Sequence, residues 1–249
     1  SPADAAGPEP YAPLSARLPR FDAFPESQAF CMWSRYIFTI IDWCTILMAH
    51  GVSVLDAAGT KAGFNNEAGR EATRIYKALH REEGDPTMFF AGKGATIWYG
   101  PWARPLFNDR NMPVKVGPPL RGPTRRVHAN YQWDWVVNAH AAPEQKAVAW
   151  DHAKFLASRP AQIDIWNVAS FMPLTRSAYE DPIIQKDEFM LAFAKYLPET
   201  ENYYVPISAW EPIEKAVIAQ LERLGANEIT VDQFMVDTEK QVNDVLAEG

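Results

Sequence analysis

The sequence predicts an α/β fold in which helices outnumber short strands. One basis for this prediction is a set of short apolar runs rich in strand formers. The clearest is residues 95–99, which Gly100 and Pro101 terminate. Segments with apolar residues at helical spacing alternate with these runs and occupy more of the chain. No internal repeat or low-complexity tract interrupts this alternation.

The first part of the chain predicts an arm and a buried helical region. Residues 1–25 are rich in proline and lack periodicity, so we expect an extended arm. Residues 26–50 have apolar side chains at helical spacing, which predicts one or two mostly buried helices ended by Gly51. If Cys31 and Cys44 lie on one helix, they are roughly 20 Å apart, too far for a disulfide. We therefore interpret both as buried thiols.

An amphipathic helix is predicted after a turn. Residues 56–59 have the composition of a turn, and Asn65 and Asn66 precede a stripe of apolar residues. The predicted helix runs over residues 67–83, with Gly84 at the position of a C-terminal cap.

The remaining elements follow from similar signals. An extended stretch at residues 112–116 leads into a proline- and arginine-rich loop, and residues 127–139 predict a strand. Thr230 and Gln233 have the spacing of a capping box. Helices are predicted over residues 143–158, 161–167, 182–196, 212–224 and 231–246.

Composition is that of an ordinary globular chain. The 249 residues are 47% hydrophobic and 22% charged, with a net charge of -7 and no long basic run, so nucleic-acid binding is disfavoured. The apolar stretch at residues 36–49 is too short for a membrane span and contains Asp42.

The tryptophan content points to two kinds of role. Nine tryptophans are weak evidence for a carbohydrate or aromatic ligand, because indoles stack on flat apolar faces. Trp102 follows a predicted strand at a Gly-Pro bend, a place where an indole either covers a core or forms one wall of a ligand cleft.

The sequence lacks the motifs of a phosphate-binding loop, a metal site and a nucleophile elbow. Gly92-Lys93-Gly94 fails as a phosphate loop, because Gly94 stands where Ser or Thr is needed and Thr87 where glycine is needed. The five histidines lack metal-ligand spacing, and a Gly-x-Ser-x-Gly elbow is absent. We expect no metal and no cofactor.

One carboxylate is a candidate for glycoside chemistry. Asp134 lies between Trp133 and Trp135, and a carboxylate pair can meet in space without a sequence pattern. The alternative interpretation is that the tryptophans belong to the core and that Asp134 is solvated.

Four stretches resemble the extracellular solute-binding proteins of ABC sugar importers, the family that includes maltose-binding protein. Their shared features are a glycine-strand-turn segment before Phe-Asn, a glycine-lysine segment ending in Gly-Pro-Trp, a helix followed by a proline loop, and a C-terminal Ser-Ala-Trp with two helices. These stretches are residues 51–66, 90–102, 147–156 with 171–175, and 208–246.

The resemblance implies a two-lobed α/β fold of the periplasmic-binding-protein type (class II), with sugar held between lobes that close over it. Family members are considerably longer, so it also implies that this sequence holds mostly the C-terminal lobe. Residues 1–130 would be the first part of that lobe. Residues 131–175 would belong to the N-terminal lobe and hinge crossing, and residues 176–249 would be the closing helices of the C-terminal lobe.

Matched residue by residue, the resemblance implies sugar stacking on Trp102 and Trp210. Trp33 and Tyr36 match the region of the family's other aromatic wall more loosely. The physics agrees, because the C–H faces of sugar rings pack on aromatic rings.

Polar partners for the sugar are expected from carboxylates. Trp133 and Asp134 would lie where the chain crosses between lobes, and Asp134 or Glu211 would accept hydrogen bonds from hydroxyls. The arginines of the loop could hold an anionic group such as a sugar phosphate, and a solvated loop is the alternative.

The resemblance implies a carbohydrate receptor without catalysis that works with the membrane subunits of an ABC transporter. We expect a monomer in the periplasm or outside the cell, with lipid anchorage as one alternative. The rival hypothesis is a carbohydrate-active enzyme that uses Asp134 and a second carboxylate. A third is that a partial cleft binds nothing.

Overall fold

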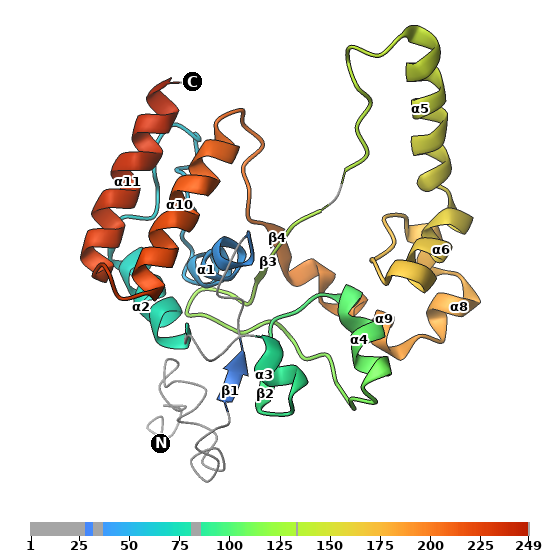
Figure 1. The fold of residues 1–249 in the computed structure, drawn as a ribbon, viewed down its shortest axis with the longest axis horizontal. Coiled ribbons are helices and arrows are strands. Elements are labelled where there is room, and N and C mark those ends of the chain that lie inside the picture. The colour runs from blue at the N-terminus through green and yellow to red at the C-terminus, as the bar shows by residue number, and fades with distance from the viewer. Residues whose placement is uncertain (1–27, 32–36, 81–85, 133, 249) are drawn as a thin grey trace, which may run out of the picture. The chain divides into compact units, whose positions relative to one another are not determined.

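The computed structural model describes residues 28–31, 37–80, 86–132 and 134–248, which divide into two compact units (Figure 1). The arm at residues 1–25 and Gly84 lie outside the described residues. Unit 1 takes its described residues from Ser1–Trp98, Pro119–Tyr131 and Glu199–Gly249, and unit 2 from Tyr99–Pro118 and Gln132–Pro198. Each unit is therefore assembled from segments that are distant in sequence.

The described strands are short, pair in parallel and belong to unit 1. β1 (Gln28–Cys31) pairs with β2 (Gly94–Ile97), and β3 (His128–Asn130) pairs with β4 (Thr200–Asn202). Parallel neighbours require long crossover connections, which explains why both partners of each pair come from different parts of the chain.

The predicted helical region at residues 26–50 is only partly correct. Residues 28–31 form a strand because they find hydrogen-bond partners in β2, far along the chain. The helix α1 (Ile37–Ala49) begins later. Cys31 and Cys44 therefore do not share a helix, and the premise of the distance prediction was wrong. Cys44 is a buried free thiol, and its burial raises the pKa of the thiol.

Helix α1 is the centre of unit 1. Its Trp43 is fully buried and meets the rings of Phe64 and Phe234 edge-on, at centroid distances of 5.4 and 5.5 Å. The helices α2 (Glu67–Leu79), α10 (Trp210–Gly225) and α11 (Val231–Glu248) pack around it (Figure 1). The apolar run that predicted buried helices is thus the core of this unit.

The C-terminal end of α1 is closed by the proline- and arginine-rich loop. Gly51 has a φ of 74°, which ends the helix in the left-handed region as predicted. The backbone N–H of Thr124 donates to the carbonyl of Ala49 at 3.1 Å. Gly122 lies so close to Ala49 that an added Cβ would come within 2.5 Å of its carbonyl oxygen. The loop therefore satisfies carbonyls that the buried helix end leaves without partners.

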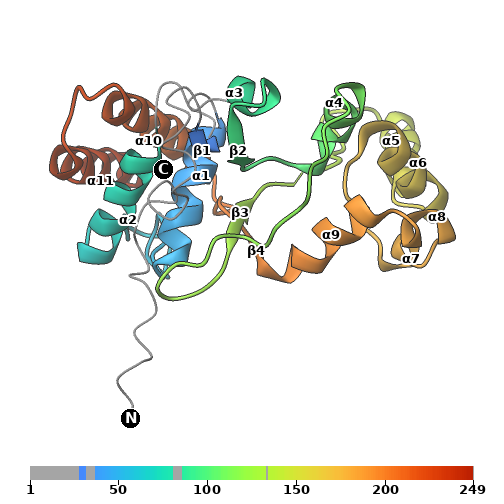
Figure 2. The same cartoon turned by 90° about the horizontal axis from the view of Figure 1, so that it is seen from below.

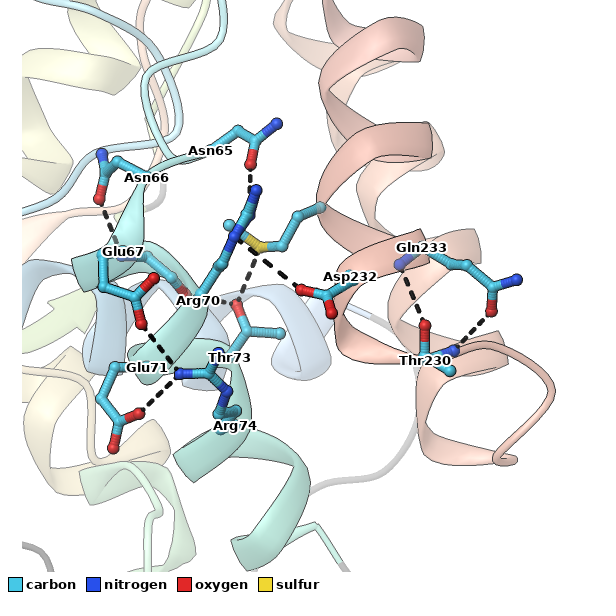
Figure 3. Close-up of polar contacts among 12 residues, drawn as sticks. Asn65, Asn66, Glu67, Arg70, Glu71, Thr73, Arg74, Thr230, Asp232 and Gln233 are labelled. Carbon is cyan, nitrogen blue, oxygen red and sulfur yellow. Dashed lines mark hydrogen bonds and ion pairs between the residues drawn. The ribbon is translucent and has the colours of Figure 1, made fainter.

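The N-terminal capping predictions for α2 and α11 are confirmed (Figure 3), but α2 ends at Leu79 with His80 as its C-terminal cap, short of the predicted end at residue 83. The side chain of Asn66 accepts from the N–H of Gly69 at 2.9 Å. The N–H of Gln233 donates to the Thr230 hydroxyl at 3.2 Å, and the Gln233 side chain accepts from the N–H of Thr230 at 2.9 Å. Such reciprocal bonds satisfy two donors at a helix start.

Unit 2 consists mainly of helices and has a small second core. The core side chains are Ile163, Trp166, Ala178, Ile184 and Met190. The helices are α4 (Arg104–Asp109), α5 (Pro143–Leu156), α6 (Arg159–Ala169), α7 (Arg176–Tyr179), α8 (Pro182–Gln185) and α9 (Glu188–Tyr196) (Figure 2). The remaining short helices are α3 (Pro86–Phe90) in unit 1, the 3₁₀ helix η2 (Pro101–Ala103) in unit 2, and the 3₁₀ helix η3 (Leu197–Glu199), where the two units join in sequence.

Two predicted elements in this region were wrong in extent. The predicted helix at residues 182–196 is two helices, because Asp187 interrupts it and caps α9 by accepting from the N–H of Met190 at 3.0 Å. The predicted strand at residues 127–139 is reduced to β3, because β4 offers it only three partners. Asp134 and Trp135 lie in irregular, exposed chain beyond it.

Candidate functional site

Trp102 occupies the turn that follows β2. Gly100 precedes the 3₁₀ helix η2, in which Pro101 is the first residue and Trp102 the second. The fixed φ of proline suits the first position of a helix, so the Gly-Pro pair converts the strand direction into a helical turn. The indole is half-buried and folds back against the backbone of Gly100. The sequence therefore specifies how this ring is presented.

Three aromatic rings of unit 2, which we call the ring cluster, meet at this turn. The centroid of Trp102 lies 5.9 Å from that of Tyr99 and 6.5 Å from that of Phe171, with interplanar angles of 42° and 36°. Burial raises the pKa of Tyr99. Phe171 keeps 37% of its surface exposed. The three rings therefore pack on one another while part of their surface stays exposed.

A charged network begins at Arg104, two residues after Trp102. The Arg104 guanidinium forms an ion pair with Asp187 at 2.5 Å and lies 4.4 Å from the ring centroid of Trp166. It also donates to the carbonyl oxygens of Trp166 and Asn167 at 3.3 and 3.5 Å. Asp187 in turn accepts from the indole N–H of Trp166 at 2.8 Å. The network ties the start of α4 to the end of α6 and the start of α9.

Trp210 belongs to unit 1, where it starts α10. It is only 8% exposed and packs against Tyr203 at a centroid distance of 6.1 Å. Its indole Nε1 is buried without a hydrogen-bond partner among the described residues. The Tyr203 hydroxyl donates to Glu214 at 2.7 Å. Trp210 thus presents little surface for stacking in this structure. Its indole N–H can still donate a hydrogen bond to a polar partner.

Glu211 faces a different direction from its neighbour. It is exposed and pairs with Lys215, one helical turn along α10, at 2.7 Å. The hydrogen bond from Lys215 lowers the pKa of Glu211, so this carboxylate is ionised at neutral pH. An exposed i,i+4 pair of this kind also occurs as ordinary helix surface.

Of the other predicted site residues, the structure describes only Asp134. Trp33, Tyr36 and Trp133 lie outside the described residues. Asp134 is exposed in irregular chain, and Trp135 beside it packs edge-on against His152 with 60% of its surface exposed. The strand predicted over residues 127–139 does not extend to Asp134.

The arginines of the loop have structural partners. Arg125 donates to the carbonyl of Met48 at 3.2 Å and pairs with Glu201 at 2.7 Å. Arg126 donates to the carbonyl of Pro119 at 2.6 Å. These contacts favour the interpretation as a structural loop over an anion clamp.

Phe171 and Arg104 were missed as site residues by the sequence reasoning. The sequence marks Phe171 only as part of a proline loop, and it marks Arg104 only by its position two residues after Trp102. Their partners lie far away in sequence, so spacing could not have revealed either contact.

The described residues show neither a metal-binding cluster nor a helix that could span a membrane. Within the described ranges, His, Cys, Asp and Glu side chains do not gather into a group of three that could hold a metal ion. In the same part of the chain, every helix is too short or too polar to cross a bilayer.

Residues 27–192 match the family described as bacterial extracellular solute-binding protein. The match covers more than half of the chain. The chain belongs to this family. No protein with curated annotation matches it significantly.

Solved structures confirm the fold class. Maltose-bound MalE3 of T. maritima matches with a TM-score of 0.78 and 17% identity, over 93% of this chain and 64% of that one. The GacH receptor of Streptomyces glaucescens, solved unliganded and with acarbose, matches with 0.78 and 18%, over 94% and 63%. MalE of Xanthomonas citri matches with 0.73 and 19%, over 91% and 60%.

These matches establish the two-lobed periplasmic-binding-protein fold that the sequence predicted. At such low identity they speak for the fold alone. The chain spans between 59% and 66% of the length of the eight structures compared.

Proposed function

We propose that this chain binds a carbohydrate and delivers it to the membrane subunits of an ABC importer, without catalysing a reaction. The observation that carries the proposal is the presentation of Trp102. Its indole is held by Gly100 and Pro101 and remains half-exposed within a ring cluster, which is how a protein offers a flat apolar face to a sugar ring. The sugar-binding relatives support the ligand class: MalE3 was solved with maltose, GacH with acarbose and an Agrobacterium radiobacter relative with ribitol.

Polar groups of three other predicted site residues are proposed as further sugar contacts. Trp210 contributes a buried indole N–H that a sugar hydroxyl can satisfy, and Glu211 contributes an exposed carboxylate. Asp134 is assigned only as an accessible acceptor. A general acid in a glycosidase works from a desolvated pocket, and the exposure of Asp134 argues against that role.

Calorimetric titration of the purified chain with maltose, acarbose and ribitol tests the proposal. Wild-type protein should bind at least one of them, and Trp102→Ala should weaken that binding about 30-fold, or ~2 kcal/mol. Trp150→Ala is the matched control, because Trp150 lies in the same unit, on α5, with 59% of its surface exposed. Equal binding by both variants would remove Trp102 from the site.

The absence of catalysis is tested separately. The sugar that binds is incubated with the protein and analysed by mass spectrometry for new products. We expect the sugar to be recovered intact, and Asp134→Asn to change at most its affinity. Product formation that disappears in Asp134→Asn would establish the enzyme hypothesis instead.

A further inference from the structure

Phe171 reaches Trp102 because of an unusual helix end. Helix α6 finishes at Ala169, and Ser170 follows with a φ of 56°, in the left-handed region. Its N–H donates to the carbonyl of Trp166 at 2.8 Å, which closes the helix and reverses the chain. Phe171 is the next residue, and its ring lies against Trp102 with 37% of its surface exposed. The helix end thus delivers a second accessible ring to the site.

Arg104 joins the two chain segments that carry these rings. It lies two residues after Trp102, and its guanidinium reaches the carbonyls of Trp166 and Asn167 in the last turn of α6, just before Phe171. Positive charge is favoured at a helix C-terminus, so the guanidinium of Arg104 stabilises the end of α6 electrostatically.

The ion pair of Arg104 with Asp187 is more sheltered than an ordinary surface pair. Both side chains are only 20% exposed, and Asp187 is held in place by capping α9 and by the indole N–H of Trp166. Charge-assisted bonds in such a setting are stronger than those on the surface. The donors of Arg104 are directed at protein groups, which gives it a positioning role rather than a place among the sugar contacts.

We propose that Phe171 is a second wall of the carbohydrate subsite on unit 2, and that Arg104 is the positioning residue that holds Phe171 and Trp102 together. The proposal rests on the proposed carbohydrate function. The two rings offer adjoining apolar faces 6.5 Å apart, tilted by 36°, to the C–H groups of one sugar ring. Specificity then depends on a wall that the Gly-Pro-Trp motif does not contain.

A double-mutant cycle in sugar affinity tests the proposal. Maltose, acarbose and ribitol are titrated into wild type, Phe171→Ala, Arg104→Met and the double variant. We expect Phe171→Ala and Arg104→Met each to weaken binding about tenfold, and the double variant to be little worse than either, because Arg104 acts through the ring positions. Phe171→Tyr, which keeps the ring, should bind as wild type does.

Arg159→Met is the matched control for Arg104→Met. Arg159 also lies in unit 2 and forms an ion pair with a capping aspartate, Asp181, at 3.0 Å, but its contacts lie away from the ring cluster. It should leave sugar affinity unchanged. Equal weakening by Arg159→Met would reduce the effect of Arg104 to general destabilisation and overturn its positioning role.

A measurement without sugar separates the two proposals. Protein labelled with 5-fluorotryptophan gives a ¹⁹F resonance for Trp102, assigned with Trp102→Phe. We expect Arg104→Met and Phe171→Ala to shift this resonance, and Arg159→Met to leave it in place. An unshifted resonance in both variants overturns the coupling of the rings.

The titrations then distinguish the remaining outcomes. If wild type binds a sugar and Phe171→Ala binds it equally well, the second wall is wrong while the proposed function stands. If wild type binds none of the three sugars, the proposed function fails and the subsite fails with it. In that case a shifted ¹⁹F resonance still establishes Arg104 as the residue that positions the rings.

Discussion

The indole of Trp102 lies across the backbone of Gly100, so closely that a Cβ built on Gly100 would stand 1.7 Å from Cζ3 of the ring and 2.0 Å from Cη2. No side chain can share that space with the ring in this position. The glycine of the Gly-Pro-Trp motif is therefore required for the direction of the indole, in addition to allowing the chain to bend.

Gly100→Ala should displace the Trp102 ring and weaken carbohydrate binding by about tenfold or more, because the ring cannot keep its place beside Phe171. Gly117→Ala is the control: it lies in the same unit, and an added Cβ there meets nothing within 4 Å. Calorimetric titration measures both. Wild-type affinity in Gly100→Ala would mean that the ring position is not set by this glycine.

Ser170→Gly should stabilise the protein by about 0.5–1 kcal/mol. Ser170 adopts a φ of 56°, which glycine accepts at lower cost, and its buried hydroxyl has no partner among the described residues. Ser170→Ala removes the hydroxyl but keeps the Cβ, so the difference between the two variants gives the backbone contribution. Urea unfolding monitored by circular dichroism provides the free energies. A destabilised Ser170→Gly would show that the serine side chain is needed.

Thr73→Val should destabilise unit 1 by about 1–3 kcal/mol. The Thr73 hydroxyl accepts from the buried indole N–H of Trp43 at 3.0 Å and donates to the carbonyl of Gly69 at 2.8 Å. Valine has nearly the same shape and neither bond. Thr238→Val is the matched control, because that buried hydroxyl on α11 lacks a partner among the described residues. Equal urea midpoints for the two variants would contradict the prediction.

Acidification below about pH 6.5 should destabilise unit 1 through His128. Burial lowers the pKa of His128 below its ordinary value of 6.5, although donation from Nδ1 to the carbonyl of Ala129 opposes the shift. Above that pH both states hold a neutral ring, and the histidine has no effect on stability. As the pH falls, the unfolded chain binds a proton before the folded one, so the free energy of unfolding decreases.

Urea midpoints between pH 7.5 and 5.5 measure this effect. His128→Gln should reduce the loss of stability on acidification, whereas His140→Gln, at an exposed position, should follow wild type. An identical pH dependence in His128→Gln and wild type would assign the loss to other groups.

Local signals predicted the starts of α2 and α11 and the end of α1. Asn66, Gly51 and the pair Thr230 and Gln233 act through contacts within a few residues, so their roles can be read from neighbouring positions. Strand β1 could not be predicted in the same way, because its apolar residues also fit a helix and only the distant strand β2 decides between the two.

The residues of the candidate site also differ in whether local sequence or distant contacts determine their positions. Gly100 and Pro101 made Trp102 a predictable candidate, since the motif determines the turn locally. Phe171 depends on the left-handed conformation of Ser170, which a serine rarely adopts. Asp187, which caps α9 and pairs with Arg104, has a role that only the folded chain creates.

Helix α11 is synthesised after every helix that it covers. Its Phe234 packs on Trp43, and its Asn243 accepts from the N–H of Ala62 at 2.8 Å. At ribosomal rates of 5–20 residues per second, roughly 10–40 s separate the appearance of α1 from that of α11. During this interval α1, the most apolar of the described helices, lacks the cover that α11 provides. Unit 1 therefore closes only once α11 has been synthesised, and until then the ring of Trp43 lacks its contact with Phe234.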